Sequence, residues 1–409
     1  MLAAATLIPS KTWADEHFGL SAHGTHRVRY QVALARRAGP AAVERDEATL
    51  TSRNLLRVEA QSLYVTGLVE LGSHLAKVTP GPASAADTDA LDVHQGYAQV
   101  GTAAGGARLA LRLGRQEMPL GSTRWVSVRD GANVRRTFDQ AKLTFSGVSW
   151  SSESFGGWLS RRRAGVFDDL PVMNDAFWGT YWTVSLEPEP ASLELFVFGR
   201  RRDHVSYVDA EGSEMRHTFG ARWFHRRSDE LEYAVHALAQ AGSIGGKRIR
   251  AWGLAAALWQ ALGGGVKIGL RTEALSGDGV GDDALGTFDP LFPNLSFFGA
   301  LAAIHPTNLY DLHPLLRLQR ERLQVEVGCA VLWRQTVADA VYTPAGARLA
   351  DPSSAGKFTG YSWTLAFAVE TSKQLWVATE ASYLDAGAAL RAGGLLGTTY
   401  FASTVTLHY

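Results

Sequence analysis

Positively charged side chains recur on one face of segments whose apolar residues occupy the alternate positions. The stretch 27–32, Arg-Val-Arg-Tyr-Gln-Val, is an example. Successive side chains of an extended strand point to opposite faces, so this spacing separates the cations from the apolar groups. A guanidinium offers a planar fork of donors that matches a carboxylate, and a row of such groups would bind or guide an anion.

The same alternation runs through most of the 409 residues and predicts an almost entirely β structure. We expect about eighteen strands, an even number. Their approximate ranges are 25–34, 52–60, 63–72, 94–100, 107–115, 138–146, 149–162, 177–187, 192–201, 214–224, 230–240, 246–261, 264–274, 309–320, 322–334, 360–371, 374–384 and 399–408.

The connections between these segments alternate in length along the chain. The long ones are 35–51, 73–93, 116–137, 163–176, 202–213, 275–308, 335–359 and 385–398, and 241–245 is the exception. The intervening connections are short. A soluble sandwich has no reason to place its long loops at one end, whereas an outer-membrane barrel has short periplasmic turns and long extracellular loops.

Composition excludes several classes of protein. The 40 Lys+Arg residues balance 40 Asp+Glu residues, which argues against a nucleic-acid-binding protein. The single cysteine, Cys329, excludes an intrachain disulfide and a cysteine-based metal cluster. The longest apolar window, 251–266, is interrupted by Gln260, so a transmembrane helix is not expected. Residues 1–24 are interpreted as either a signal-peptide remnant or a disordered tail, and 25–409 as one barrel domain.

The alternation alone fits two architectures. In a soluble sandwich the apolar face is the core, and in a membrane barrel it meets lipid while the polar face lines a lumen. The even strand count, the unequal loops and the C-terminal segment 401–409, which ends on Tyr409, favour the barrel. A closed barrel also pairs every backbone group without water, as a bilayer requires.

Several ordered motifs resemble the bacterial alginate export family, over roughly residues 25–409. They are Leu111-Arg-Leu-Gly-Arg-Gln-Glu117, Val126-Ser-Val-Arg-Asp130, Asn133-Val-Arg-Arg-Thr-Phe-Asp139, Arg248-Ile-Arg-Ala-Trp252, Ser276-Gly-Asp278, Leu285-Gly-Thr-Phe288, Leu291-Phe-Pro293, Asn308-Leu-Tyr-Asp-Leu-His-Pro314 and Trp333-Arg-Gln335. The resemblance implies a monomeric outer-membrane barrel of about eighteen strands with an arginine-rich lumen. It also implies that alginate, a polyuronate, leaves the periplasm through it, although many members have no proven alginate substrate.

If the polar face points inward, the lumen wall is mainly basic. The expected lumen cations on the strands are Arg27, Arg29, Arg57, Arg108, Arg112, Lys142, Arg200, Arg216, Arg222, Lys267, Arg271, Arg317 and Arg334. The acidic groups on the same faces are Glu59, Glu70, Glu194, Glu273, Asp311, Glu326, Glu370 and Glu380. Rings of arginine and lysine select anions, so the pattern indicates an anion path.

Other candidates depend on how the chain folds locally. Strict alternation points Arg115 toward lipid, where a charge is costly. A bulge at Gly114 would turn it inward. A position at the outer end of its strand would also keep the charge out of the membrane interior. The resemblance favours the inward position. The loop 116–137 carries Arg124, Arg129, Asp130, Arg135 and Arg136, and either narrows the pore or forms a solvated cluster outside it.

The loop 275–308 is the longest. It contains Asp278, Asp282, Asp283 and Asp289, which either gate against an anion, bind Ca²⁺ or lie on a plain exposed loop. The spacing matches no known calcium loop, so the exposed loop is favoured. Trp252 and Trp376 occur at positions that alternate with the polar residues of their strands, so we expect them on the lumen face. They are candidates for stacking on sugar rings, with packing inside the lumen as the simpler interpretation.

The sequence therefore predicts a passive, anion-selective channel in the bacterial outer membrane. Its expected partners are an anionic polysaccharide or small anionic solute and the surrounding lipid and lipopolysaccharide, but no nucleic acid, and it is expected to be a monomer. No catalytic motif is present and no cofactor or metal is expected. An uptake porin for small solutes, a barrel enzyme using a serine and a histidine, and a soluble β-protein remain alternatives.

Overall fold

The computed structural model describes residues 18–37, 45–186, 191–226, 231–279, 281, 283–352 and 355–409. The strands are β1 (Gly19–Arg37), β2 (Arg45–Gln61), β3 (Val65–Thr79), β4 (Asp89–Ala104), β5 (Ala107–Gln116), β6 (Phe138–Ser146), β7 (Trp150–Arg161), β8 (Leu170–Leu186), β9 (Ala191–Ser206), β10 (Glu211–His225), β11 (Leu231–Ile244), β12 (Lys247–Gly263), β13 (Val266–Leu275), β14 (Ala284–Leu285), β15 (Leu309–Arg320), β16 (Leu323–Trp333), β17 (Val341–Tyr342), β18 (Arg348–Ala350), β19 (Phe358–Glu370), β20 (Leu375–Ala386) and β21 (Leu395–His408). Two short helices, η1 (Leu295–Phe298) and α1 (Ala388–Ala392), lie in connections.

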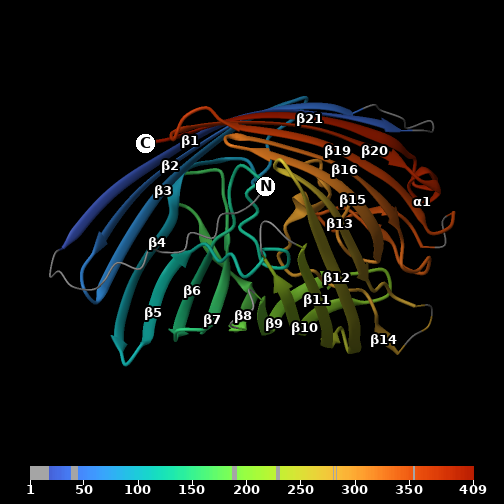
Figure 1. The fold of residues 1–409 in the computed structure, drawn as a ribbon. Helices are drawn as coiled ribbons and strands as arrows, with labels where there is room; N and C mark the ends of the chain where they lie inside the picture. The colour runs from blue at the N-terminus through green and yellow to red at the C-terminus, as the bar shows by residue number, and fades with distance from the viewer. Residues whose placement is uncertain are drawn as a thin grey trace.

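Eighteen of these strands form a closed antiparallel barrel, as predicted. Each long strand pairs with its neighbour in the sequence, and β1 pairs with β21 to close the ring, with Val28 opposite Val405. Figure 1 shows β1 and β21 side by side in one wall. β14 pairs in parallel with β12 above the end of β13, while β17 and β18 form a separate hairpin. Closure leaves the sheet without a free edge.

The alternation of side chains determines which face of the wall meets lipid. On β19, Trp363, Leu365 and Phe367 are exposed on the outside, and the residues between them point inward. The same outward apolar band continues on β12 with Leu254 and Leu258. Inward positions carry the buried polar residues, so the polar face lines the lumen as expected. No helix in the described ranges is long and apolar enough to cross a membrane.

Several strands are longer than the sequence pattern predicts. β1 begins at Gly19 rather than at residue 25, and residues 1–17 of the expected N-terminal segment lie outside the described part. β9 and β10 extend to Ser206 and from Glu211, so the long connection predicted at 202–213 is wrong and a tight turn replaces it. Strand pairing continues beyond the membrane, where the outward residues become polar and the alternation of hydrophobicity stops.

Two of the remaining long connections fold into the barrel rather than away from it. We call residues 117–137 the constriction loop and residues 276–308 the plug loop. The constriction loop is visible inside the ring of strands in Figure 1. The two loops join through backbone hydrogen bonds, because Phe292 N–H donates to Trp125 O at 2.9 Å and Ser127 N–H donates to Phe292 O at 2.9 Å. They therefore form one inner body.

An aromatic core fixes this inner body to the wall. The ring of Phe292 on the plug loop lies 5.1 Å from that of Phe138 and 4.9 Å from that of Phe177, both edge-on. Phe196 and Phe198 of β9 stack beside them, with ring centres 4.8 Å apart. Part of the interior is therefore a packed hydrophobic core rather than a water-filled lumen, and edge-to-face packing of this kind stabilises a single arrangement.

Candidate functional site: the lumen and its inner loops

The constriction loop is fastened to the wall at its acidic residue Asp130. Arg53 of β2 donates to the Asp130 carboxylate at 2.8 Å, and Arg27 of β1 donates to the backbone carbonyl of Asp130 at 2.8 Å. Arg135 of the same loop lies 4.0 Å from the carboxylate. Burial would raise the pKa of Asp130, but these three guanidinium groups hold it well below its ordinary value. Asp130 is therefore an anchor that stays charged.

The plug loop is fastened through Asp289. Its carboxylate forms an ion pair with Arg202 of β9 and lies 3.9 Å from Arg200. Burial would raise the pKa of Asp289, and the two guanidinium groups lower it below its ordinary value. Asp278 is also structural, because it accepts the Gly286 N–H at 2.7 Å. The expectation of a plain exposed loop is therefore wrong for these two residues.

The other two predicted carboxylates of this loop are Asp282 and Asp283. Asp283 is exposed, and Asp282 lies outside the described residues. The loop folds inward because its buried acids and aromatic side chains find partners on the wall, which the local sequence does not reveal.

Most of the predicted wall cations point into the lumen but are already neutralised there. Lys142 pairs with Glu153 at 2.9 Å and Arg222 with Glu194 at 2.8 Å, each across neighbouring strands. The predicted cations with such partners on the wall are Arg57, Lys142, Arg200, Arg216, Arg222, Lys267, Arg271 and Arg317. Paired cations attract a passing anion less strongly than free ones, so these residues contribute less to the path than predicted.

A smaller set of inward cations forms no ion pair with any described carboxylate. On the wall, Arg112 donates to Gln99 at 2.9 Å and lies over the Tyr97 ring, and Arg29 donates to the Tyr400 hydroxyl at 2.6 Å. Arg108 lies on the same face of β5 as Arg112 and is exposed near the periplasmic turn. Arg334 does not belong to this set; it is fully buried under the loop after β16 and donates to the carbonyl of Asp351 at 3.0 Å.

Three arginines converge where the constriction loop returns to the wall. Arg129 and Arg136 belong to the loop, and Arg162 follows β7. None of the three forms an ion pair within the described structure; Arg136 donates to Ser127 O at 3.1 Å and lies over the Phe292 ring. Burial, Arg162 and Arg129 lower the pKa of Arg136 well below its ordinary value, and burial with Arg129 lowers that of Arg162 to about 10. These cations repel one another, which a bound anion would relieve.

Arg115 does not join the lumen set. It shares the parity of the outward residues Leu111 and Leu113, and β5 pairs continuously with both neighbours through Gly114, so the expected bulge is absent. Its guanidinium binds Asp139 at 2.9 and 3.1 Å at the extracellular end of the strand. The position at the strand end, rather than an inward turn, spares this cation from lipid.

The lumen aromatic residue is not the one that the sequence indicates. Trp252 lies outward and is exposed, next to Leu254. Trp259, on the opposite face of β12, is buried inside with Arg317 over its ring at 4.1 Å and Arg271 at 5.4 Å. Trp376 keeps its inward parity opposite Glu370.

The sequence pattern did not indicate three further arginines of the lumen. Arg53, Arg162 and Arg202 all contact or approach the inner loops. Arg53 lies within the predicted strand 52–60 on the same face as Arg57, so applying the alternation to the whole of that strand would have found it. The others lie in loops or beyond the predicted strand centres, where alternation gives no information.

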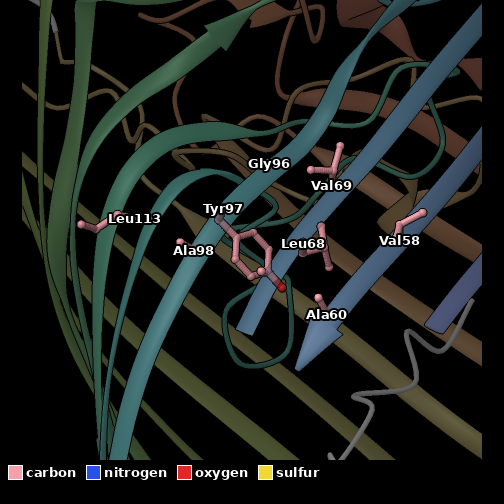
Figure 2. Close-up of a pocket in the computed structure, with 9 residues that line it drawn as sticks. Val58, Ala60, Leu68, Val69, Gly96, Tyr97, Ala98 and Leu113 are labelled. Carbon is pink, nitrogen blue, oxygen red and sulfur yellow. The ribbon is translucent and has the colours of Figure 1, made fainter. Parts of the chain in front are cut away.

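A hollow of about 500 Å³ lies on the wall but outside the lumen. It is lined by apolar side chains on the outward face, among them Val58, Val69 and Leu113, where Gly67 and Gly96 have no side chain (Figure 2). Because these residues belong to the lipid-facing set, this hollow is not part of the path through the barrel.

The barrel is similar to solved porin structures of Pseudomonas aeruginosa. It matches OccK5 (OpdH) with a TM-score of 0.61 at 12% identity, covering 95% of this chain and 98% of the other. It matches OccK11 (OpdR) with a TM-score of 0.59 at 13% identity, covering 95% of each chain. The outer membrane protein opdK matches with a TM-score of 0.60 at 11% identity, covering 95% and 99%. At these identities the likeness shows the fold alone.

The fold and the inner loops define a porin-like channel of the bacterial outer membrane. The model of the alginate export family matches residues 11–400, so the chain belongs to that family. Among curated proteins, no sequence matches it. Family and fold together establish a barrel for transport across the outer membrane.

Proposed function

We propose that this protein is an anion-selective channel whose solute is a chain of uronate groups such as alginate. The observation that carries the proposal is the cluster of Arg129, Arg136 and Arg162 beside the constriction loop, none of which forms an ion pair in the described structure, although carboxylates such as Asp87 and Asp169 lie near enough to act on their charges. Cations in a narrow lumen attract anions and repel cations. Three neighbouring guanidinium groups can also contact several carboxylates of a polyanion, whereas a single guanidinium can contact only one.

The path to this cluster begins on the inner face of β5. Arg108 lies near the periplasmic turn, and Arg112 lies four positions further along the same face. Both lack an ion pair in the described ranges, so a carboxylate entering from the periplasm would meet them in sequence. Each contact is open to water and therefore weak, which allows the solute to leave as well as enter.

The paired cations have a different role in the proposal. Pairs such as Arg222 with Glu194 keep the wall hydrated and hold the side chains out of the path, without binding the solute tightly. We assign no catalytic step to the chain, and transport is passive. In this proposal the barrel acts as a monomer surrounded by lipid and lipopolysaccharide.

The test is single-channel recording of the purified protein in a planar bilayer with oligouronate added on one side. The proposal predicts transient current blocks that become more frequent with oligouronate concentration and disappear in the triple variant Arg129→Gln, Arg136→Gln, Arg162→Gln. The matched control is Lys267→Gln, since Lys267 is already paired with Glu232 at 2.8 Å. Anion selectivity without any block would overturn the polyuronate assignment and favour a porin for small anions.

A further inference from the structure

Three metal-binding side chains meet at the root of the constriction loop. Glu70 comes from β3, His94 from β4, and Glu117 is the first residue of the loop after β5. His94 Nε2 lies 2.9 Å from Glu117 Oε1 and 3.9 Å from Glu70 Oε1. One donor atom from each residue lies within 4.8 Å of the other two. The register of three neighbouring strands therefore brings together one imidazole and two carboxylates.

These separations suit a small transition-metal ion. A tetrahedral Zn²⁺ with bonds of about 2.0–2.2 Å places its donor atoms about 3.3 Å apart. The observed 2.9 and 3.9 Å lie on either side of that value, so small side-chain movements would complete the geometry. Imidazole with carboxylate is a donor set that Zn²⁺ accepts. Ca²⁺ prefers a larger shell of oxygens and fits less well.

The surroundings of the cluster hold its donors in place. The side chains of Glu70 and His94 are buried. Gln95 bridges the two carboxylate residues, because its Nε2 donates to Glu70 Oε1 at 3.1 Å and its Oε1 accepts the Glu117 backbone N–H at 3.0 Å. Such outer hydrogen bonds orient metal ligands in other proteins.

A neighbouring histidine supplies an independent indication of a ligand. His74 of β3 is fully buried; its Nδ1 lies 3.7 Å from Asp89 Oδ2, and its Nε2 has no hydrogen-bond partner. Its ring centre lies 5.8 Å from that of His94. Buried polar atoms are nearly always satisfied, so the unsatisfied Nε2 beside this cluster indicates a missing partner. A turn of the His74 ring toward the cluster offers a fourth donor.

Arg135 competes with a metal ion for the cluster. Its Nε lies 2.8 Å from Glu117 Oε1 but is not aligned for a hydrogen bond. When Glu117 Oε1 binds the metal ion, Arg135 shifts to the second oxygen of Glu117 and remains an outer partner. A cation bound there would fix the first residue of the constriction loop to two wall strands.

From this geometry we propose that Glu70, His94 and Glu117 bind a divalent transition-metal ion, with Zn²⁺ as the probe. The ion pins the root of the constriction loop to β3 and β4. The proposal does not depend on which solute the channel passes, because metal content is measured without transport.

The test is equilibrium binding of Zn²⁺ to the folded, detergent-purified barrel after removal of metal with a chelator. We expect one ion per chain in the parent protein and in His408→Gln, a control at an exposed histidine of β21. His94→Gln and Glu117→Gln should each weaken binding by more than about tenfold. Equal binding by all four proteins, or no binding by the parent, would overturn the proposal.

A second measurement avoids variants that fail to fold. Co²⁺ added to the parent protein should give the visible absorption bands of a four-coordinate site with nitrogen and oxygen donors. Zn²⁺ should then displace it and abolish the bands. A spectrum indistinguishable from that of Co²⁺ in buffer would contradict the site whatever the variants show.

Discussion

Arg124 and Glu273 form a two-point ion pair that links the constriction loop to the wall strand β13. Both side chains are almost completely buried. Arg124 also donates to Asn294 O at 3.2 Å, so one guanidinium joins the constriction loop, the plug loop and the wall. A buried charge pair of this kind specifies one loop position strongly, because either charge alone would be costly to bury.

Removing one partner of this pair should release the inner body. We expect Glu273→Gln to destabilise the closed loop arrangement by about 3 kcal/mol, since it leaves the Arg124 charge buried without its counter-ion. The strands should remain paired, because their backbone hydrogen bonds are unchanged. Single-channel recording should show a larger conductance with more frequent fluctuations between levels.

The matched control for this variant is Glu153→Gln. Glu153 pairs with Lys142 between two wall strands and contacts neither inner loop in the described structure. Its conductance should equal that of the parent protein. Equal changes in both variants would show that the lumen charge, rather than the Arg124 anchor, determines conductance.

Asp130 should weaken anion selectivity in the parent protein. It lies among Arg27, Arg53 and Arg135, so Asp130→Asn leaves three positive charges without their shared counter-ion. A unit charge about 8 Å from the path in water contributes roughly 0.5 kcal/mol, which is about twofold in the anion-to-cation permeability ratio. Reversal potentials in a salt gradient measure this ratio. Asp203→Asn, at an exposed pair with Arg201 outside the lumen, should leave it unchanged.

His305 of the plug loop should make the loop sensitive to acid. Burial lowers its pKa from 6.5 to about 4. Between those two pH values a released loop binds a proton that the docked loop does not, so docking weakens as the pH falls from 6.5 toward 4 and is unaffected above 6.5. Limited proteolysis of the plug loop across this range measures docking. His305→Gln should remove most of the pH dependence; an unchanged profile would show that another group titrates.

Charge placed on the two faces of one strand should have opposite consequences. Leu365→Arg puts a cation on the outward face in the middle of β19 and should cost about 2–4 kcal/mol of folding free energy in a bilayer. Ala366→Arg faces the lumen beside Glu326 and Glu380, so it should be nearly neutral. Unfolding by urea in lipid vesicles measures both. A similar loss in the two variants would contradict the assignment of the faces.

The barrel could be predicted from the sequence because its signals are local. Alternation identifies a strand and its two faces within ten residues, as the 27–32 segment illustrates, and it correctly places Arg27, Arg112 and Arg222 on the inner face. The extensions of β9 and β10 were missed because pairing continues where apolar alternation has ended.

The inner loops could not be predicted because their contacts are distant in the sequence. Arg53 and Asp130 are 77 positions apart, and Arg124 and Glu273 are 149 positions apart. Phe196 and Phe198 share the inward face with charged residues, so alternation gives no reason to expect an aromatic core there. The number of unpaired lumen cations was overestimated because their partners depend on how the strands align. Wall carboxylates such as Glu153 and Glu214 can be assigned to their arginine or lysine partners only when the strand register is known.

The central claim is that unpaired arginines at the constriction select anions. The most direct test is the reversal potential of the reconstituted channel in a potassium chloride gradient, for the parent protein and for the triple variant Arg129→Glu, Arg136→Glu, Arg162→Glu. We expect the parent protein to be chloride-selective and the variant to have a reversal potential of the opposite sign. A cation-selective parent, or a variant that remains chloride-selective, would contradict the central claim.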